Sequence, residues 1–182
     1  MMVKKLETTT DYAGLPGIYF RKLLDTIVSV GNLDRDGLTI LDYGAGYGVL
    51  RRMLNARNAK VKVVNYDVVP ELTDIDDWHD VNFDIVVANE VFCYLEASQL
   101  ERLLTEFRQK NENAELIIGI SKQSFVNNIG KVILGKWNAH ILTKLKPKDE
   151  LSVLSKYMEI ISHKSVWYLA DVYRFRFKTT PA

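Results

Sequence analysis

The sequence has 182 residues, including one cysteine and three histidines, and its 24 basic and 23 acidic residues give a net charge of +1. This length suits one domain with a sizeable core, and the balanced charge gives no field that would attract nucleic acid. A disulfide within the chain is excluded, a metal site is not expected, and no stretch approaches the roughly 18 apolar residues of a membrane span. Because the start of the chain also lacks an apolar signal core, we expect a cytoplasmic protein.

Apolar doublets four residues apart predict a first helix over 18–28. Helical spacing starts again at Val49, directly after a glycine-rich turn, and it returns over 98–110, where Ser98 is a plausible cap. Short apolar runs, each typical of a strand buried on both faces of a parallel sheet, occur at 37–44, 59–67, 82–89 and 113–121.

The C-terminal part of the sequence predicts a short helix over 148–158 and then two strands over 165–178. We expect a tight turn between these strands around Ala170 and Asp171. Strands and helices alternate along most of the chain, and this order predicts an α/β fold.

The stretch from Ile40 to Gly48, ILDYGAGYG, joins a strand to a helix through glycines at every second position. Such a turn offers backbone N–H groups and the positive end of a helix dipole to a ligand. The dinucleotide fingerprint spaces its glycines differently, as G-x-G-x-x-G, and Asp42 would bring negative charge close to a pyrophosphate. The turn also lacks the Gly-Lys-Ser/Thr ending of a phosphate-binding loop. A cationic ligand therefore suits it better, and an NAD(P)-dependent oxidoreductase is a disfavoured alternative.

At every defined position, ILDYGAGYG resembles the first motif of the class I S-adenosylmethionine-dependent methyltransferases. The segment VVNYD, which ends in Asp67, is similar to the family's next strand, and FDIVVANEVF over 83–92 is similar to its fourth. The tail over 140–154 resembles the small-molecule branch. The resemblance implies a single domain over 1–182 with a Rossmann-like, doubly wound fold. We expect a mostly parallel sheet with an antiparallel terminal strand, in a three-layer α/β/α sandwich.

The resemblance also implies roles for particular residues. Asp42 and the backbone of Tyr43, Gly44 and Gly46 would surround the methionine part of S-adenosylmethionine, which leaves as S-adenosylhomocysteine. Asp67 would hold the ribose. The remaining cofactor candidates are Val68 against the adenine, Asp76 or Asp77 on its amino group, Trp78 over its ring, Asn89 at the end of the next strand, and Arg21 on the cofactor carboxylate.

The chain is shorter than the family pattern between Asp67 and Asp84, which are only 17 positions apart. We expect a helix to be missing there, with a short strand around Leu72 to Ile75. The acids near Trp78 have a simpler explanation as a solvated loop, and Asp76 and Asp77 cannot be ranked by spacing.

Glu90, Tyr94 and His140 are the candidate catalytic groups. Related enzymes often carry a histidine near the place of Cys93 and Tyr94, so the base is left open; proton removal adds only about 10²–10⁴-fold and is needed only for a protonated acceptor. Cys93 itself fits a small buried hydrophobe better than a nucleophile. A binding protein for S-adenosylmethionine or adenosine without turnover is the main alternative.

Two further segments are candidates for closing the site. Residues 1–35 form a predicted cap helix, with Tyr12, Tyr19 and Arg21 as contacts, and 121–148 form a predicted lid or insertion with six lysines and no acid. Residues 125–137 read as an amphipathic helix, for which core packing or contact with a membrane surface are both open. The acceptor is expected to be a small molecule or a lipid- or sugar-linked group.

Overall fold

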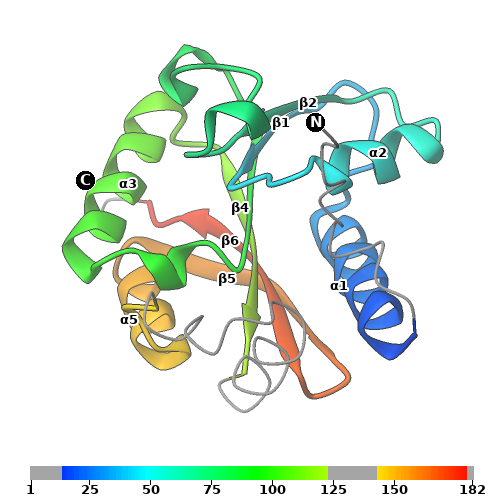
Figure 1. The fold of residues 1–182 in the computed structure, drawn as a ribbon. Coiled ribbons are helices and arrows are strands. Elements are labelled where there is room, and N and C mark those ends of the chain that lie inside the picture. The colour runs from blue at the N-terminus through cyan, green and yellow to red at the C-terminus, as the bar shows by residue number, and fades with distance from the viewer. Residues whose placement is uncertain (1–13, 123–142, 180–182) are drawn as a thin grey trace, which may run out of the picture.

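In the computed structural model, which describes residues 14–122 and 143–179, six strands form one mixed sheet in the order β2-β1-β3-β4-β6-β5 (Figure 1). β1 to β4 are parallel, and β6 pairs antiparallel with both β4 and β5. The predicted parallel sheet with an antiparallel terminal strand is confirmed. The strands are β1 (Thr39–Tyr43), β2 (Lys62–Tyr66), β3 (Ile85–Asn89), β4 (Glu115–Ser121), β5 (Met158–Val166) and β6 (Ala170–Phe177).

Helices cover both faces of the sheet (Figure 1). Adjacent strand residues point to opposite faces, so Ile40 packs in the core beneath the helices of one face and Leu41 in the core beneath those of the other. This arrangement confirms the predicted three-layer α/β/α sandwich. One face carries α1 (Leu15–Gly31) and α2 (Val49–Ala56), and the other carries α3 (Ala97–Lys110) and α5 (Pro147–Tyr157).

None of the helices within 14–122 and 143–179 is long and apolar enough to cross a membrane. α1 packs against β4, β5 and β6 as part of one helical layer. The closing role of 1–35 stays a prediction, since 1–13 lie outside the described residues. The predicted lid over 121–148 and the membrane-contact helix over 125–137 likewise fall mostly on 123–142, which are not described.

The predicted cap of α3 is wrong. The helix begins after Glu96, and Ser98 lies within its first turn. Glu96 and Gln99 form a capping box in which the Glu96 side chain accepts from the helix backbone and the Glu96 N–H donates to Gln99 Oε1 over 2.8 Å. A carboxylate with a glutamine three residues later satisfies both free N–H groups, which the Ser98 hydroxyl could not do from inside the helix.

The position of the terminal hairpin turn was also predicted wrongly. Trp167 and Tyr168, not Ala170 and Asp171, are the central residues of the turn, with φ angles of 48° and 59°. The turn closes through a hydrogen bond from Leu169 N to Val166 O (2.9 Å). Ala170 instead opens β6 and is fully buried against the sheet.

The connection from β2 to β3 is as short as the sequence indicated. Between Asp67 and Asp84 the structure has two single turns of 3₁₀ helix, η1 (Pro70–Leu72) and η2 (Trp78–Asp80). As predicted, this fully described stretch contains no α-helix. The predicted strand over Leu72 to Ile75 is wrong, because this segment makes only one pair of strand-like contacts with β2.

That pair of contacts is made by Asp74. Its N–H donates to Asn65 O (3.0 Å), and its carboxylate accepts from Asn65 N (2.7 Å). Asp74 also forms an ion pair with Arg51 of α2. One residue, through its backbone N–H and its carboxylate, therefore satisfies the outer edge of β2 at Asn65, where a neighbouring strand would otherwise pair.

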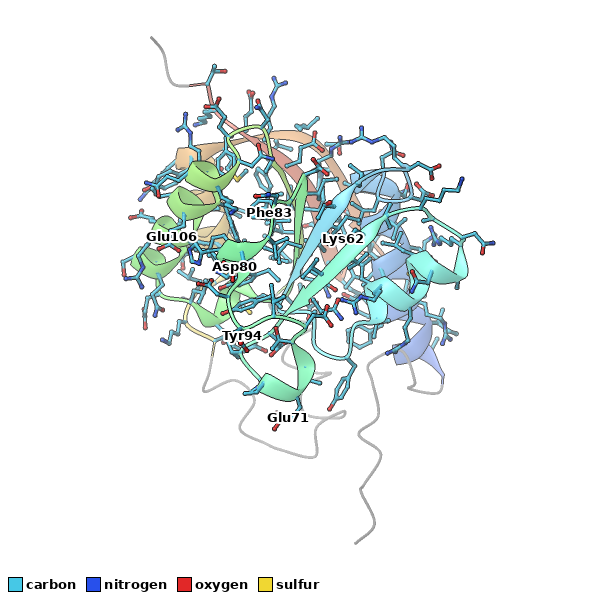
Figure 2. All side chains as sticks on the ribbon, turned by 90° about the horizontal axis from the view of Figure 1, so that it is seen from above. Lys62, Glu71, Asp80, Phe83, Tyr94 and Glu106 are labelled. Atoms are coloured by element: carbon cyan, nitrogen blue, oxygen red, sulfur yellow. The ribbon has the colours of Figure 1, made fainter. Side chains whose placement is uncertain are left out.

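The rest of this edge is open and lines a groove of about 840 Å³. Because the N–H of Lys62 bonds toward β1 and that of Asn65 bonds outward, Val63 directs its backbone outward too. Figure 2 labels Lys62 and Asp80, which both line the groove. Its lining includes neither the glycine turn nor Asp42, so it is separate from the carboxyl ends of the strands.

We predict that Asp74→Ala lowers the free energy of unfolding by about 1–2 kcal/mol, because it removes the acceptor for Asn65 N and leaves Arg51 without its ion pair. Denaturant unfolding measures the change. Asp36→Ala, at an exposed loop position, is the matched control and should stay within about 0.5 kcal/mol of the parent. Equal stability of the two variants would show that Asp74 does not support the edge of β2.

Candidate functional site

The candidate site lies where the parallel strands end. Asp42 lies near the end of β1, Asp67 directly follows β2, Asn89 and Glu90 follow one another at the end of β3, and Ser121 ends β4. Since neighbouring parallel strands end at the same edge, the structure gathers these polar groups along one side of the sheet. Ligands of open α/β sheets bind in this position.

The glycine turn is fastened to the end of β2. Gly44 N and Ala45 N both donate to Tyr66 O, at 2.7 and 3.1 Å. Gly46 N donates to Asp67 Oδ2 (2.9 Å), while Asp67 Oδ1 accepts from Val69 N (3.0 Å). The conformation of the turn is therefore set by β2 and by the acid that follows it.

The three glycines of this turn have positive φ angles, and they differ in what surrounds them. A Cβ at Gly44 would lie 2.3 Å from Val91 Cγ2, and one at Gly48 would lie 2.5 Å from Asn65 Nδ2. At Gly46, with φ of 52°, no atom lies within 4 Å of that position. Gly44 and Gly48 thus allow close packing of the protein, whereas Gly46 leaves space for a ligand to approach the backbone.

Asp42 is a buried acid beside this turn, with only 6% of its surface exposed. The pKa of Asp42 is raised to about 7, mainly by burial; the Arg51 guanidinium opposes the rise, and the Asp67 carboxylate adds to it. A buried carboxyl of this kind becomes favourable as an anion when a cation binds next to it. The electrostatics of the site therefore favour a positively charged ligand.

The residues predicted to surround adenine lie on the segment after β2. Val68 is 85% exposed, directly beside Asp67. Asp76 and Asp77 are exposed, and Asp77 accepts from His79 N (2.9 Å) to cap η2. Trp78 is buried in the core, with its ring 4.7 Å from that of Phe107, so packing accounts for its position.

The other predicted contacts come from separate elements. Arg21 is on the exposed side of α1, and the Tyr43 ring packs 5.1 Å from that of Tyr66. Tyr94, labelled in Figure 2, belongs to η3 (Phe92–Tyr94) and is half exposed; burial, Cys93 and Glu90 raise its pKa. His140 lies outside the described residues.

Glu90 occupies a strained position at the end of β3. Its φ of 58° is unusual for a residue with a side chain, and such strain is often found at functional sites. Its N–H donates to Gly119 O (2.9 Å), and its carboxylate accepts a hydrogen bond from the Ser121 hydroxyl. Burial raises the pKa of Glu90, and the Ser121 hydrogen bond opposes the rise.

Three residues of this edge were not identified from the sequence: Gly119, Ser121 and Glu150. A Cβ at Gly119 would lie 2.2 Å from Asn89 Oδ1, so this glycine makes room for the Asn89 side chain. Glu150 is only 4% exposed although it is charged. A signal for it was present, because Glu150 precedes Val153 and Leu154 by three and four residues on the apolar face of α5.

A family model described as a methyltransferase domain matches residues 17–129, more than half of the chain. The protein is a member of this methyltransferase family. Membership makes it an S-adenosylmethionine-dependent enzyme. The buried acid Asp42, the open space over Gly46 and the acid Asp67 fit such a cofactor, which carries a cationic sulfur and a ribose. No curated protein matches the sequence.

Solved structures agree on the fold of the methyltransferase. The PH0226 protein of Pyrococcus horikoshii is 12% identical, with 94% of this chain and 96% of that chain covered and a TM-score of 0.71. Magnesium protoporphyrin IX methyltransferase of Synechocystis with bound SAH is 17% identical (89% and 84% covered, TM-score 0.57). Human N-acetylserotonin methyltransferase in complex with SAM is 16% identical (90% and 52% covered, TM-score 0.63).

We predict that Gly46→Ala weakens S-adenosylmethionine binding by at least about tenfold, because the added methyl group fills the open space over the turn. Gly37→Ala is the matched control, since Gly37 also has a positive φ and nothing within 4 Å, but lies outside the turn. Both variants should lose about 1–2 kcal/mol of stability through backbone strain. Calorimetric titration measures the loss of binding separately from the loss of stability. Equal affinities of the two variants for S-adenosylmethionine would show that Gly46 does not belong to the binding site.

Proposed function

We propose that this methyltransferase transfers a methyl group to a small-molecule acceptor bound beside Glu90. The observation that supports this most directly is that the polar groups at the carboxyl ends of the strands form two sets. Asp42, Gly46 and Asp67 lie at the ends of β1 and β2. Glu90 and Ser121 lie at the ends of β3 and β4. The first group suits the cofactor and the second an acceptor next to it. Small molecules are preferred over lipid- or sugar-linked acceptors because the edge is lined by buried, closely spaced groups.

In this proposal Asp42 and the backbone of Tyr43, Gly44 and Gly46 hold the methionine part of the cofactor. Asp67 receives the ribose hydroxyls, since each of its oxygens accepts one backbone N–H and keeps a second lone pair free for a donor. Val68, with Asp76 or Asp77, forms the adenine side, and Trp78 supports this segment from the core. Asn89 and Arg21 complete the contacts, and Glu90, Tyr94 and His140 are the groups that could hold a proton.

S-adenosylmethionine supplies a methyl group on a cationic sulfur and needs no further activation. The protein's main tasks are therefore to align the acceptor and to exclude water. Alignment alone corresponds to effective molarities of about 10⁵ M or more, or about 7 kcal/mol. The rigid placement of Glu90 by Ser121 and Gly119 serves this alignment.

Calorimetric titration with S-adenosylmethionine, S-adenosylhomocysteine and NAD tests the proposal. We expect both sulfur compounds to bind and NAD not to bind. Asp67→Ala should weaken both by at least about tenfold through loss of the ribose contacts. Asp34→Ala, an exposed change away from the site, should leave both affinities unchanged. Unchanged affinity in Asp67→Ala, or binding of NAD alone, would contradict the assignment.

The pKa of Asp42 makes binding depend on pH. Without ligand this carboxyl titrates at about pH 7, and a bound cation favours its ionised form, so binding below pH 7 releases a proton. We predict that affinity for S-adenosylmethionine rises from about pH 6 to about pH 8, by less than about tenfold per unit. In Asp42→Asn the affinity should be weaker, and this part of its pH dependence should disappear.

The raised pKa of Asp42 also makes the stability of the fold depend on pH. Stability changes in the opposite direction to affinity, because it falls as pH rises. Because the folded pKa of Asp42 is raised, the folded protein holds its proton more tightly than the unfolded chain, so the stability contributed by this group falls as pH rises from about 4 to about 7. At about pH 8, Asp42→Asn should therefore unfold with a free energy at least about 1 kcal/mol higher than the parent. Denaturant titrations at about pH 5 and about pH 8 measure this difference, which should shrink at the lower pH.

A further inference from the structure

Glu150 is a second buried carboxyl near Glu90, and it reaches that place from another element. Lys144 N and Leu145 N both donate to Cys93 O, at 2.7 and 3.1 Å, and this fastens the start of α5 to η3. Cys93 Sγ in turn donates to the backbone oxygen of Glu90 (3.4 Å). In Figure 1, α5 lies at the same end of the sheet as the end of β4.

The titration behaviour of three groups agrees with this arrangement. Burial raises the pKa of Cys93 to about 12, and Glu150 and Glu90 each add to the rise. Burial, and then the charge of Glu90, raise the pKa of Glu150 to about 8. The hydrogen bonds on either side of Cys93 account for this mutual influence, because they join the end of β3 at Glu90 to the segment that leads into α5.

Neither carboxyl has a cationic partner within the described parts of the chain. Glu90 accepts only the neutral Ser121 hydroxyl, and no described residue forms a hydrogen bond or an ion pair with the Glu150 carboxyl. A buried carboxyl without a partner is costly, and two of them cannot readily ionise together. A ligand with a positive charge and several N–H donors would satisfy both.

Two aromatic side chains lie near the Ser121 end of β4, which pairs with Ala170 beside the hairpin turn. Tyr19 of α1 is almost fully buried, and burial, followed by the charge of Glu90, raises the pKa of its hydroxyl. The Trp167 ring lies 6.3 Å from that of Tyr19 and is half exposed at the hairpin turn. Aromatic faces of this kind attract cations.

We propose that Glu90 and Glu150, with Tyr19 and Trp167, form the acceptor site and that the acceptor is an amine, bound as its ammonium ion. This inference rests on the proposed function and specifies the acceptor of that same site. The evidence for a ligand here is the almost fully buried carboxyl of Glu150, which no described residue pairs with, in a helix whose start is fastened to η3 next to Glu90.

The chemistry of an amine acceptor uses these groups directly. The bound ammonium gives one proton to the Glu90 carboxylate, whose raised pKa makes it a stronger base. The nitrogen lone pair then forms a bond to the methyl carbon while the carbon–sulfur bond breaks, and its electron pair stays on sulfur. The products are an N-methylammonium ion and the thioether S-adenosylhomocysteine, and Glu90 later releases its proton to water.

The test uses pairs of ligands that share a carbon skeleton: ethylamine and ethanol, benzylamine and benzyl alcohol, phenethylamine and phenylethanol, tryptamine and tryptophol. Each is titrated calorimetrically into the full-length protein saturated with S-adenosylhomocysteine. We expect at least one amine to bind about tenfold or more tighter than its alcohol. Glu150→Gln and Glu90→Gln should each lose this preference, and the exposed Glu112→Gln should keep it.

The inference is overturned if no amine binds more tightly than its alcohol, or if the preference survives in both Gln variants. Affinity for S-adenosylhomocysteine is measured for every variant and shows whether the cofactor site is intact. If it is intact and the amine preference is absent, the acceptor inference is wrong and the proposed function is unaffected. A parent protein that does not bind S-adenosylhomocysteine would overturn both. Unfolding curves establish that the Gln variants are folded, and Glu150→Gln should be at least as stable as the parent because it removes a buried titratable group.

Discussion

The site depends on the carbonyl oxygen of Tyr66, which accepts two consecutive N–H groups of the glycine turn. These hydrogen bonds hold the turn between β1 and α2 against the end of β2, and Asp67 continues the same contact to Gly46. The position of Asp42, the direction of α2 and the space over Gly46 all follow from this attachment. Because Gly44 and Gly48 are in close contact with Val91 and Asn65, the turn has little freedom to adopt another shape.

The short connection between β2 and β3 affects the outer edge of β2, but not the hydrogen bonds between the glycine turn and Tyr66. Asp74 satisfies Asn65 with one backbone and one side-chain hydrogen bond, one residue before Tyr66. The edge is thereby closed next to the site and left open farther away, along the groove at Val63. The short connection between β2 and β3 thus leaves the hydrogen bonds that hold the glycine turn in place.

Much of this architecture could be predicted because it depends on local patterns. The positions of the parallel strands along the chain and the glycine turn follow from short apolar runs and from glycine spacing, and the resemblance to a family indicated the acids Asp42 and Asp67. What could not be predicted depends on contacts between distant segments. Glu150 is buried because α5 docks on η3, and Asp74 replaces a strand because its loop folds back on Asn65. Ser98 was mistaken for a cap because Glu96 and Gln99 satisfy the helix end together.

The hairpin turn between β5 and β6 takes its conformation from contacts with the rest of the domain. A two-residue turn with both central residues in the left-handed conformation normally contains asparagine and glycine, and here it contains tryptophan and tyrosine. Such a turn does not form by itself, because two bulky residues oppose its backbone conformation. The pairing of β6 with β4 and the contact of Trp167 with Tyr19 on α1 must therefore supply the stabilisation. The position of Trp167 at the tip of the hairpin thus depends on the sheet and on α1, and not on the sequence of the turn itself.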